Sequence, residues 1–323
     1  GFDHDFGNDT SARFFGYGQI FLGIPYANAP LGERRFSLPE DICEYNDRGD
    51  VHNATYYRPR CWQTMSAESA DNMDEDCLYL NVVTPNVTGN YPVMVYIHGG
   101  TFTTGGADIY HWKGTIRNLV SRGVVVVTIQ YRLGMLGFFT TFTETFPPNR
   151  GLYDQILSLR WVNEEIASFG GDPDRITIFG QSAGAAAVSD LSLSLLARGL
   201  FHQLIMSSGS AYMELETVDD LRGSTSKNRA AKICPFTTAE WGSQENDEDL
   251  LTCLLHATPQ ELIAYDFSDG KGWNAAIDGA LIPDFPEVLA KSRPKYPSMH
   301  GDMLEDYSVF SIANFRIMTK QVQ

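Results

Sequence analysis

Short apolar runs recur through the middle of the chain, and each ends at glycine or in a polar segment. They occupy residues 91–97, 124–129, 175–179 and 204–206, and a shorter strand-like stretch covers 18–23. Runs of this length that are apolar at nearly every position are typical of parallel strands buried on both faces. The pattern therefore predicts a mostly parallel central sheet.

The segment at residues 153–166 has a different period. Its apolar side chains at 156, 159, 162 and 166 recur at helical spacing, which predicts an amphipathic helix. This helix lies between the second and third long apolar runs. Strands that alternate with helices form crossover units, so we predict an α/β fold with helices flanking the sheet.

The remaining segments are more polar. Residues 1–90 are rich in turns, and residues 211–271 are richer in Asp, Glu, Ser and Thr, with helical patches. We interpret 211–271 as an insertion packed on the core sheet. The length alone suggests about two domains. A single large α/β domain often has more residues than this estimate allows, so we expect one domain over 1–323.

Acidic residues outnumber basic ones, 40 to 24, for a formal net charge of -16. Such a field repels nucleic acid and anionic membranes, so neither is an expected partner. The acidity has two interpretations, solubility or attraction of a cationic substrate. No apolar run reaches the ~18 residues that a membrane-spanning helix needs.

The cysteines form two local pairs, Cys61 with Cys77 and Cys234 with Cys253. Each pair would close a short polar loop, where a disulfide restricts the unfolded chain. No CxxC motif is present, so we expect no zinc site, and the sequence implies no other metal and no cofactor. Cys43 is left over, either as a buried free thiol or with a partner outside this chain.

Three N-glycosylation sequons begin at Asn8, Asn53 and Asn86. A single sequon is weak evidence, but the three together with paired cysteines favour an oxidising compartment. We therefore expect a secreted or extracellular glycoprotein, or one of the endoplasmic reticulum lumen. The chain begins with Gly1, and we interpret it as a processed or excised piece whose lack of a leader says nothing about localisation.

The pentapeptide GQSAG at residues 180–184 follows a β-branched run and precedes sequence suited to a helix. Strand, tight turn and helix in this order form the nucleophile elbow of α/β-hydrolases. It would expose the Ser182 hydroxyl near a helix N-terminus, where negative charge is favoured. The alternative is an ordinary glycine-rich turn that opens a helix.

A second glycine-rich turn, HGGTF at residues 98–102, also follows a buried run. Hydrolases of this type bind the oxyanion of the tetrahedral intermediate with backbone N–H groups from such a loop. A plain turn after a strand is the alternative. The two turns together favour a serine hydrolase.

Together with several other segments, these two turns resemble the type-B carboxylesterase/cholinesterase family. The matching segments are residues 169–184, which resemble the family's serine signature, 75–82, which resemble its second signature, and 21–27, 131–134 and 278–283. They occur in order across nearly the whole chain. The resemblance implies an α/β-hydrolase fold and a carboxylic-ester hydrolase, or a non-catalytic adhesion protein of the neuroligin or neurotactin kind with a protein partner.

The resemblance also implies residue roles. Ser182 matches the nucleophile, and Gly100, Thr101 and Ala183 match the oxyanion-hole positions. The Cys61–Cys77 and Cys234–Cys253 pairs resemble the family's first two disulfides. Thr101 departs from the usual glycine, which keeps the N–H but places a side chain toward the acyl pocket.

The resemblance does not extend to the features that select acetylcholine. Gln181 stands where cholinesterases carry Glu, and juvenile-hormone-esterase-like members also have Gln. The loop of residues 62–76 is shorter than in cholinesterases, and no Trp occupies the choline-binding position. These departures argue against acetylcholine and leave a small-molecule ester of unassigned acyl and alcohol groups.

The family's catalytic acid corresponds to the segment at residues 299–310. Counting from both of its ends places Asp306 at the acid position, with Glu305 as the alternate. Tyr307 replaces the usual glycine there. A solvated acidic loop is the alternative interpretation.

The triad order in these hydrolases is serine, acid, histidine, but no histidine follows His300. Without a base Ser182 is a weak nucleophile, and loss of a triad member leaves ~10³–10⁴-fold catalysis over water. We therefore expect either a piece of a longer esterase, incomplete at the C-terminus and lacking the histidine and a third disulfide, or a short non-catalytic relative. The retained serine elbow favours the first.

Overall fold

The fold is described by a computed structural model over residues 1–42, 51–64, 72–212, 215, 217, 225–235, 243–267, 272–304 and 306. Its strands are β1 (Phe2–Asp5), β2 (Tyr17–Pro25), β3 (Arg60–Cys61), β4 (Met73–Asp74), β5 (Tyr79–Thr84), β6 (Tyr91–Ile97), β7 (Val125–Ile129), β8 (Gly171–Gln181), β9 (Gln203–Ser207) and β10 (Ser298–Gly301). Its helices are α1 (Trp112–Asn118), α2 (Gly134–Phe138), α3 (Arg150–Glu165), α4 (Ala183–Leu193), α6 (Thr225–Ala230), α7 (Gln244–His256), α8 (Pro259–Ile263) and α9 (Pro286–Leu289).

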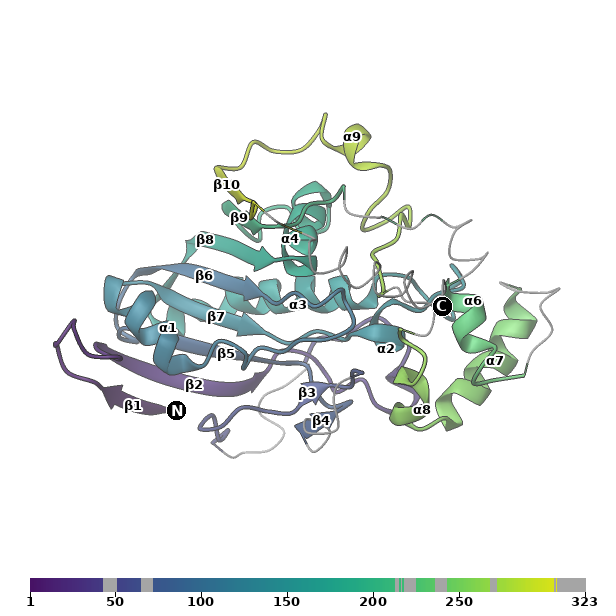
Figure 1. The fold of residues 1–323 in the computed structure, drawn as a ribbon, viewed down its shortest axis with the longest axis horizontal. Coiled ribbons are helices and arrows are strands. Elements are labelled where there is room, and N and C mark those ends of the chain that lie inside the picture. Colours follow the sequence, from purple (N-terminus) through teal and green to yellow (C-terminus); the bar gives the residue numbers. More distant parts are fainter. Residues whose placement is uncertain are drawn as a thin grey trace, which may run out of the picture.

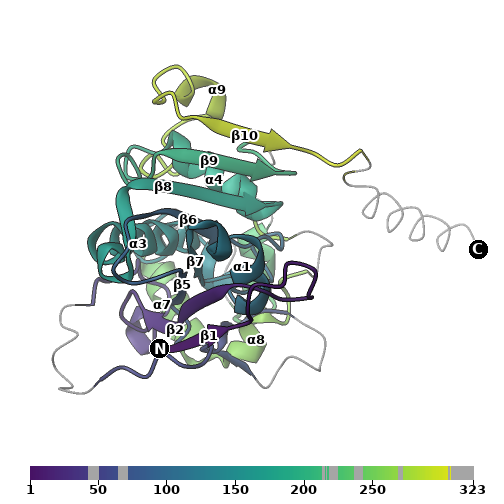
Figure 2. The same cartoon turned by 90° about the vertical axis from the view of Figure 1, so that its left-hand side faces the viewer.

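The central sheet has eight strands in the order β1-β2-β5-β7-β6-β8-β9-β10 (Figure 1; Figure 2). The pairings among β1, β2, β5 and β7 are antiparallel. Every pairing from β7 through β6, β8 and β9 to β10 is parallel. The predicted α/β fold is confirmed, and the predicted apolar runs are strands of its sheet.

Helices cover both faces of this sheet. Core side chains of α3 and α4, such as Leu159 and Val188, share one hydrophobic cluster with Val95 of β6. Ile116 of α1 belongs to a second cluster on the opposite face, with Val126 of β7. The helix predicted at residues 153–166 is confirmed as α3, which begins three residues earlier, at Arg150.

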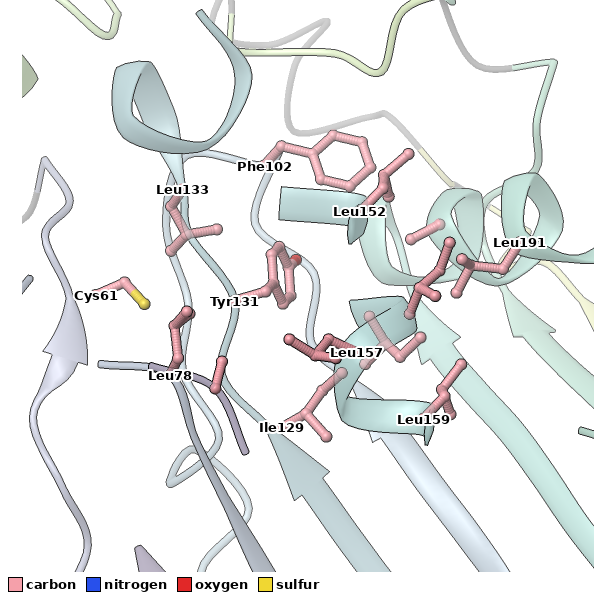
Figure 3. Packing of buried hydrophobic residues seen from close by; sticks show 14 of the residues in the cluster. Cys61, Leu78, Phe102, Ile129, Tyr131, Leu133, Leu152, Leu157, Leu159 and Leu191 are labelled. Carbon is pink, nitrogen blue, oxygen red and sulfur yellow. The ribbon is translucent and has the colours of Figure 1, made fainter. Parts of the chain in front are cut away.

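The core reaches from the sheet to the loops at the carboxyl ends of its strands (Figure 3). Ile129 at the end of β7 and Tyr131 in the following loop are fully buried. Leu152 and Leu157 of α3 and Phe102 of the loop after β6 belong to the same hydrophobic cluster. The loops that carry the candidate chemistry are therefore anchored in the core.

Helices α6, α7 and α8, from the predicted insertion, lie beyond the carboxyl ends of the parallel strands (Figure 1). The buried Arg35 guanidinium donates to the carbonyl oxygens of Leu254, Leu255 and Ala257 at the end of α7, at 2.8–3.1 Å. It also makes two 2.7 Å bonds to Glu75. Arg35 thus satisfies carbonyls that a helix C-terminus leaves unpaired.

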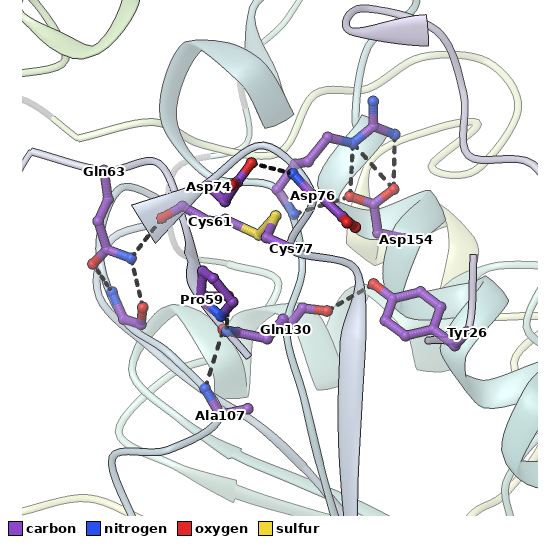
Figure 4. The surroundings of a disulfide bond; sticks show 12 residues. Tyr26, Pro59, Cys61, Gln63, Asp74, Asp76, Cys77, Ala107, Gln130 and Asp154 are labelled. Carbon is purple, nitrogen blue, oxygen red and sulfur yellow. Dashed lines mark hydrogen bonds and ion pairs between the residues drawn. A yellow bond between two sulfur atoms is a disulfide. The ribbon is translucent and has the colours of Figure 1, made fainter. Parts of the chain in front are cut away.

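Both predicted disulfides form, Cys61–Cys77 and Cys234–Cys253. The side-chain amide of Gln63 bonds to Cys61 and to both backbone groups of Gly105, so the first disulfide is tied to the loop after β6 (Figure 4). Cys43 lies outside the described residues. The sequon residues Asn8, Asn53 and Asn86 are all exposed.

No helix in the described ranges is long and apolar enough to cross a membrane. No group of three or more His, Cys, Asp and Glu side chains there is arranged to hold a metal ion.

Replacing Cys61 and Cys77 together by serine should lower the free energy of unfolding by about 3 kcal/mol, because the crosslink closes a short loop. The two cysteines are 16 residues apart. Guanidinium unfolding measures the change. The matched control is the double serine variant of Cys234 and Cys253, 19 residues apart, which should lose a similar amount. A loss below about 1 kcal/mol in both variants would contradict the loop-closure account.

Candidate active site

Ser182 lies in the sharp turn between β8 and α4. Its backbone has φ 55° and ψ -126°, a conformation that a non-glycine residue rarely adopts. Its glycine neighbours allow the turn. A Cβ atom on Gly180 would lie 2.4 Å from the carbonyl carbon of Gly184, and a Cβ on Gly184 would lie 2.2 Å from the carbonyl oxygen of Ile97. The strand–turn–helix geometry of a nucleophile elbow is therefore present.

The loop after β6 lies directly against this elbow. A Cβ on Gly99 would be 2.3 Å from the carbonyl oxygen of Gln181 and 3.2 Å from Cβ of Ser182. Gly100, Thr101 and Phe102 all have positive φ, at 117°, 55° and 52°. The two glycine-rich turns found in the sequence thus meet in space, backbone to backbone.

Peptide planarity fixes the direction of the N–H groups in this loop. The carbonyl of Gly99 bonds to Nδ1 of His98 at 3.0 Å, and the carbonyl of Gly100 accepts from the backbone N–H of Thr103. Since N–H and C=O point in opposite directions across a trans peptide, these bonds direct the N–H groups of Gly100 and Thr101 the other way. Neither N–H has an acceptor among the described residues.

Ala183 contributes a third N–H group. It is the first residue of α4, so its N–H has no partner within the helix and lies at the positive end of the helix dipole. Gly100, Thr101 and Ala183 thus each offer a backbone N–H in the two turns that meet at Gly99 and Ser182. Donors of this kind stabilise the negative oxygen of a tetrahedral acyl intermediate.

Thr101 holds its side chain against its own loop. The hydroxyl donates to the carbonyl of Gly100 at 2.7 Å. A Cβ on Gly272 would lie 2.7 Å from Cβ of Thr101, so the threonine side chain packs on that glycine. The threonine side chain therefore fills the space next to Gly272.

His98 supports the loop and is not placed to act as a base. Its ring is 1% exposed and stacks on Tyr131, with centroids 4.3 Å apart. Since the Gly99 carbonyl only accepts, Nδ1 carries the proton of a neutral ring. Burial lowers the pKa of His98 to about 4, so the ring stays neutral near pH 7. His98 therefore has a structural role in this loop.

Three other histidines bond to nearby backbone groups. His111 caps α1, His202 accepts from the N–H of Ile176, and His256 bonds to a carbonyl within α7. In the described part of the chain, no hydrogen bond links a histidine to the Ser182 hydroxyl.

Asp306 follows the end of β10, the outermost parallel strand. Its carboxylate accepts from the N–H of Met303 at 2.7 Å and closes a turn. The strand ends near the elbow, because the N–H of Ser208 donates to the carbonyl of Gly301 at 2.8 Å. No bond joins Asp306 to Ser182 or to a histidine among the described residues, and Glu305 lies outside them.

The structure adds residues that sequence reasoning missed. A Cβ on Gly209 would lie 2.3 Å from the carbonyl oxygen of Ser182, so the turn after β9 also presses on the elbow. The backbone N–H of Trp273 donates to the carbonyl of Thr101 at 3.2 Å. The Ser-Ser-Gly sequence at the end of β9 indicates a tight turn there, which could have predicted the contact with Ser182. Nothing local in the sequence marked the second.

The chain matches the profile of the carboxylesterase family over residues 7–322. It is 38% identical to cocaine esterase of Homo sapiens over 86% of this chain and 50% of that protein. It is 35% identical to gut esterase 1 of Caenorhabditis briggsae over 93% and 53%. It is 39% identical to liver carboxylesterase 1 of Oryctolagus cuniculus over 85% and 52%. The chain thus spans about half the length of these curated relatives.

Replacing Gly184 by alanine should destabilise the chain by about 1–3 kcal/mol, because the new methyl group would press on the Ile97 carbonyl. The matched control is Gly114→Ala in α1, where an added Cβ meets nothing within 4 Å. There the lost backbone freedom should stabilise by about 0.5–1 kcal/mol. Denaturant unfolding distinguishes the two. Equal stability of Gly184→Ala and wild type would refute the close-packed elbow.

Proposed function

Because the chain belongs to the carboxylesterase family, we propose that it carries the nucleophile and oxyanion hole of a serine hydrolase that acts on carboxylic esters. The proposal covers one hydrolase domain over residues 1–323. The observation that carries it is the strained Ser182 turn in backbone contact with the loop at Gly99.

In the proposed reaction, Ser182 attacks the carbonyl carbon of the ester. The carbonyl oxygen becomes negative and accepts from the N–H groups of Gly100, Thr101 and Ala183. Collapse of this tetrahedral intermediate breaks the ester bond, releases the alcohol and leaves an acyl group on Ser182. Water then attacks the acyl-enzyme and releases the acid.

A base is needed in both halves of this reaction. It takes the serine proton and gives it to the leaving alcohol oxygen, and later takes a proton from water and gives it to the Ser182 oxygen. We assign that role to a histidine that is not one of the seven in residues 1–323, and we propose that Asp306 orients it. Asp306 is proposed from the family resemblance and from its place after the parallel strand that reaches Ser208. Glu305 is the alternate.

The substrate proposed is a small uncharged ester. Gln181 at the end of β8 is exposed and uncharged, so it offers a cationic group no ion pair. An adhesion role is not favoured, since the relatives named above are esterases or carboxylesterases. The two disulfides and three exposed sequons support a secreted or endoplasmic reticulum location.

Covalent labelling tests the nucleophile. The protein expressed from its complete coding sequence should react with a fluorophosphonate probe at Ser182, identified by peptide mass spectrometry. Ser182→Ala should remove the label, because no other serine lies in the elbow. Ser208→Ala, which changes a neighbouring serine at φ 55°, is the matched control and should keep it. A folded wild type that takes no label would sink the proposal.

The acid is tested in the same protein by comparing Asp306→Asn with Glu305→Gln. The true acid orients and stabilises the histidine, so its replacement should lower kcat by about 10⁴-fold, while the other variant should stay near wild type. Steady-state hydrolysis of a short-chain nitrophenyl ester measures both. If neither variant changes kcat, the acid lies elsewhere.

A further inference from the structure

Asp266 is a buried carboxylate that bonds to residues adjoining the active-site loop. It follows α8 and is 1% exposed. Its Oδ1 accepts the backbone N–H of Met135 at 3.0 Å and the indole N–H of Trp273 at 2.7 Å. A Cβ on Gly134 would lie 2.1 Å from Oδ2, so the carboxylate sits against the start of α2.

The same two elements hold the oxyanion loop. At the start of α2, the N–H of Gly134 donates to the carbonyl of Phe102 at 2.8 Å. The backbone N–H of Trp273 donates to the carbonyl of Thr101 at 3.2 Å. These two carbonyls belong to the loop residues at φ 55° and 52°. The Thr101 carbonyl also accepts from the Thr103 hydroxyl at 2.8 Å. Asp266 therefore holds the side chain of one backbone donor, Trp273, and the residue next to the other, Met135 beside Gly134.

Trp273 is held on its face as well as at its edge. The Arg229 guanidinium lies 4.4 Å from the centroid of the indole ring and donates to the carbonyl of Gly272 at 3.2 Å. The indole is 1% exposed. Arg229 thus covers the face of the indole while Asp266 accepts from the N–H at its edge, so both contacts hold the Trp273 side chain.

We propose that Asp266 is a positioning residue for the oxyanion loop, and that its charge state sets how firmly Trp273 and α2 hold Thr101 and Phe102. The proposal rests on the function proposed above. The carboxylate accepts both N–H groups with the added strength of a charged acceptor. When it is protonated it loses that charge, both bonds weaken, and the loop is held less firmly.

The carboxyl is placed to change state near neutral pH. Burial raises the pKa of Asp266 to about 7, while the Trp273 indole, the Arg229 charge and the Met135 N–H oppose that rise. Of the described elements packed against it, α6 contributes the charged Arg229, whereas α2 and Trp273 contribute no charge. Because this pKa is raised in the folded chain, its contribution to stability declines as pH rises from 3.8 to about 7.

Nuclear magnetic resonance tests the coupling without relying on activity. In the protein from its complete coding sequence, labelled with ¹⁵N-tryptophan and ¹⁵N-threonine, the Trp273 indole and the Thr101 amide should shift together with a midpoint near pH 7. Trp273→Phe and Thr101→Gly assign the two signals. Asp266→Asn keeps the size and one oxygen acceptor, and should abolish both shifts. Signals that do not titrate in wild type would overturn the proposal.

Kinetics tests the consequence for catalysis. Asp266→Asn should lower kcat about 10-fold with little change in KM, less than the 10²–10³-fold lost when an oxyanion donor is removed. The matched control is Asp247→Asn, a buried carboxylate bonded to Thr141 and Thr143, which should keep kcat. An unchanged kcat in folded Asp266→Asn would overturn the positioning role. A wild type that neither hydrolyses esters nor takes the probe would instead defeat the proposed function, while the coupled shifts would still support control of the loop by Asp266.

Discussion

The backbone contact between the Ser182 turn and the loop after β6 is the constraint on which the rest of the site depends. Gly99 lies against Gln181 and Ser182, and Gly184 lies against Ile97, at distances that leave no room for a Cβ atom. Both turns leave neighbouring parallel strands, β6 and β8, which are paired along their length. The sheet thus brings the two turns together, and glycine allows them to touch.

Given that contact, the chemistry follows from which backbone groups are already bonded. The carbonyls of the loop are occupied by His98, Thr103, Trp273 and Gly134. The N–H groups of Gly100 and Thr101 therefore face the other way. Fixed donors of this kind need no reorganisation when charge develops, which is why buried, pre-bonded carbonyls matter for an acyl-transfer site.

Several segments that are far apart in the sequence hold this loop in place. Gln63, beside the Cys61–Cys77 disulfide, bonds to Gly105 at one end of the loop. Asp266 fastens Trp273 and α2 on another side. Arg35 anchors the end of α7, which leads into the segment carrying Asp266. The chain spans about half the length of the curated relatives it matches.

The parallel strands, the α3 helix, the two disulfides and the elbow at Ser182 could all be predicted from the amino-acid pattern. Each of these has a local cause: the period of apolar side chains, a short loop between cysteines, or a glycine that a tight turn requires. Three features became visible only in the folded chain: the antiparallel pairing of the N-terminal strands, the neutral support that His98 gives the loop, and the contacts that link Asp266 to it. Met135 and Asp266 are 131 residues apart, and their contact leaves no local pattern, because it exists only once the sheet and helices have brought both segments to the same end of the fold.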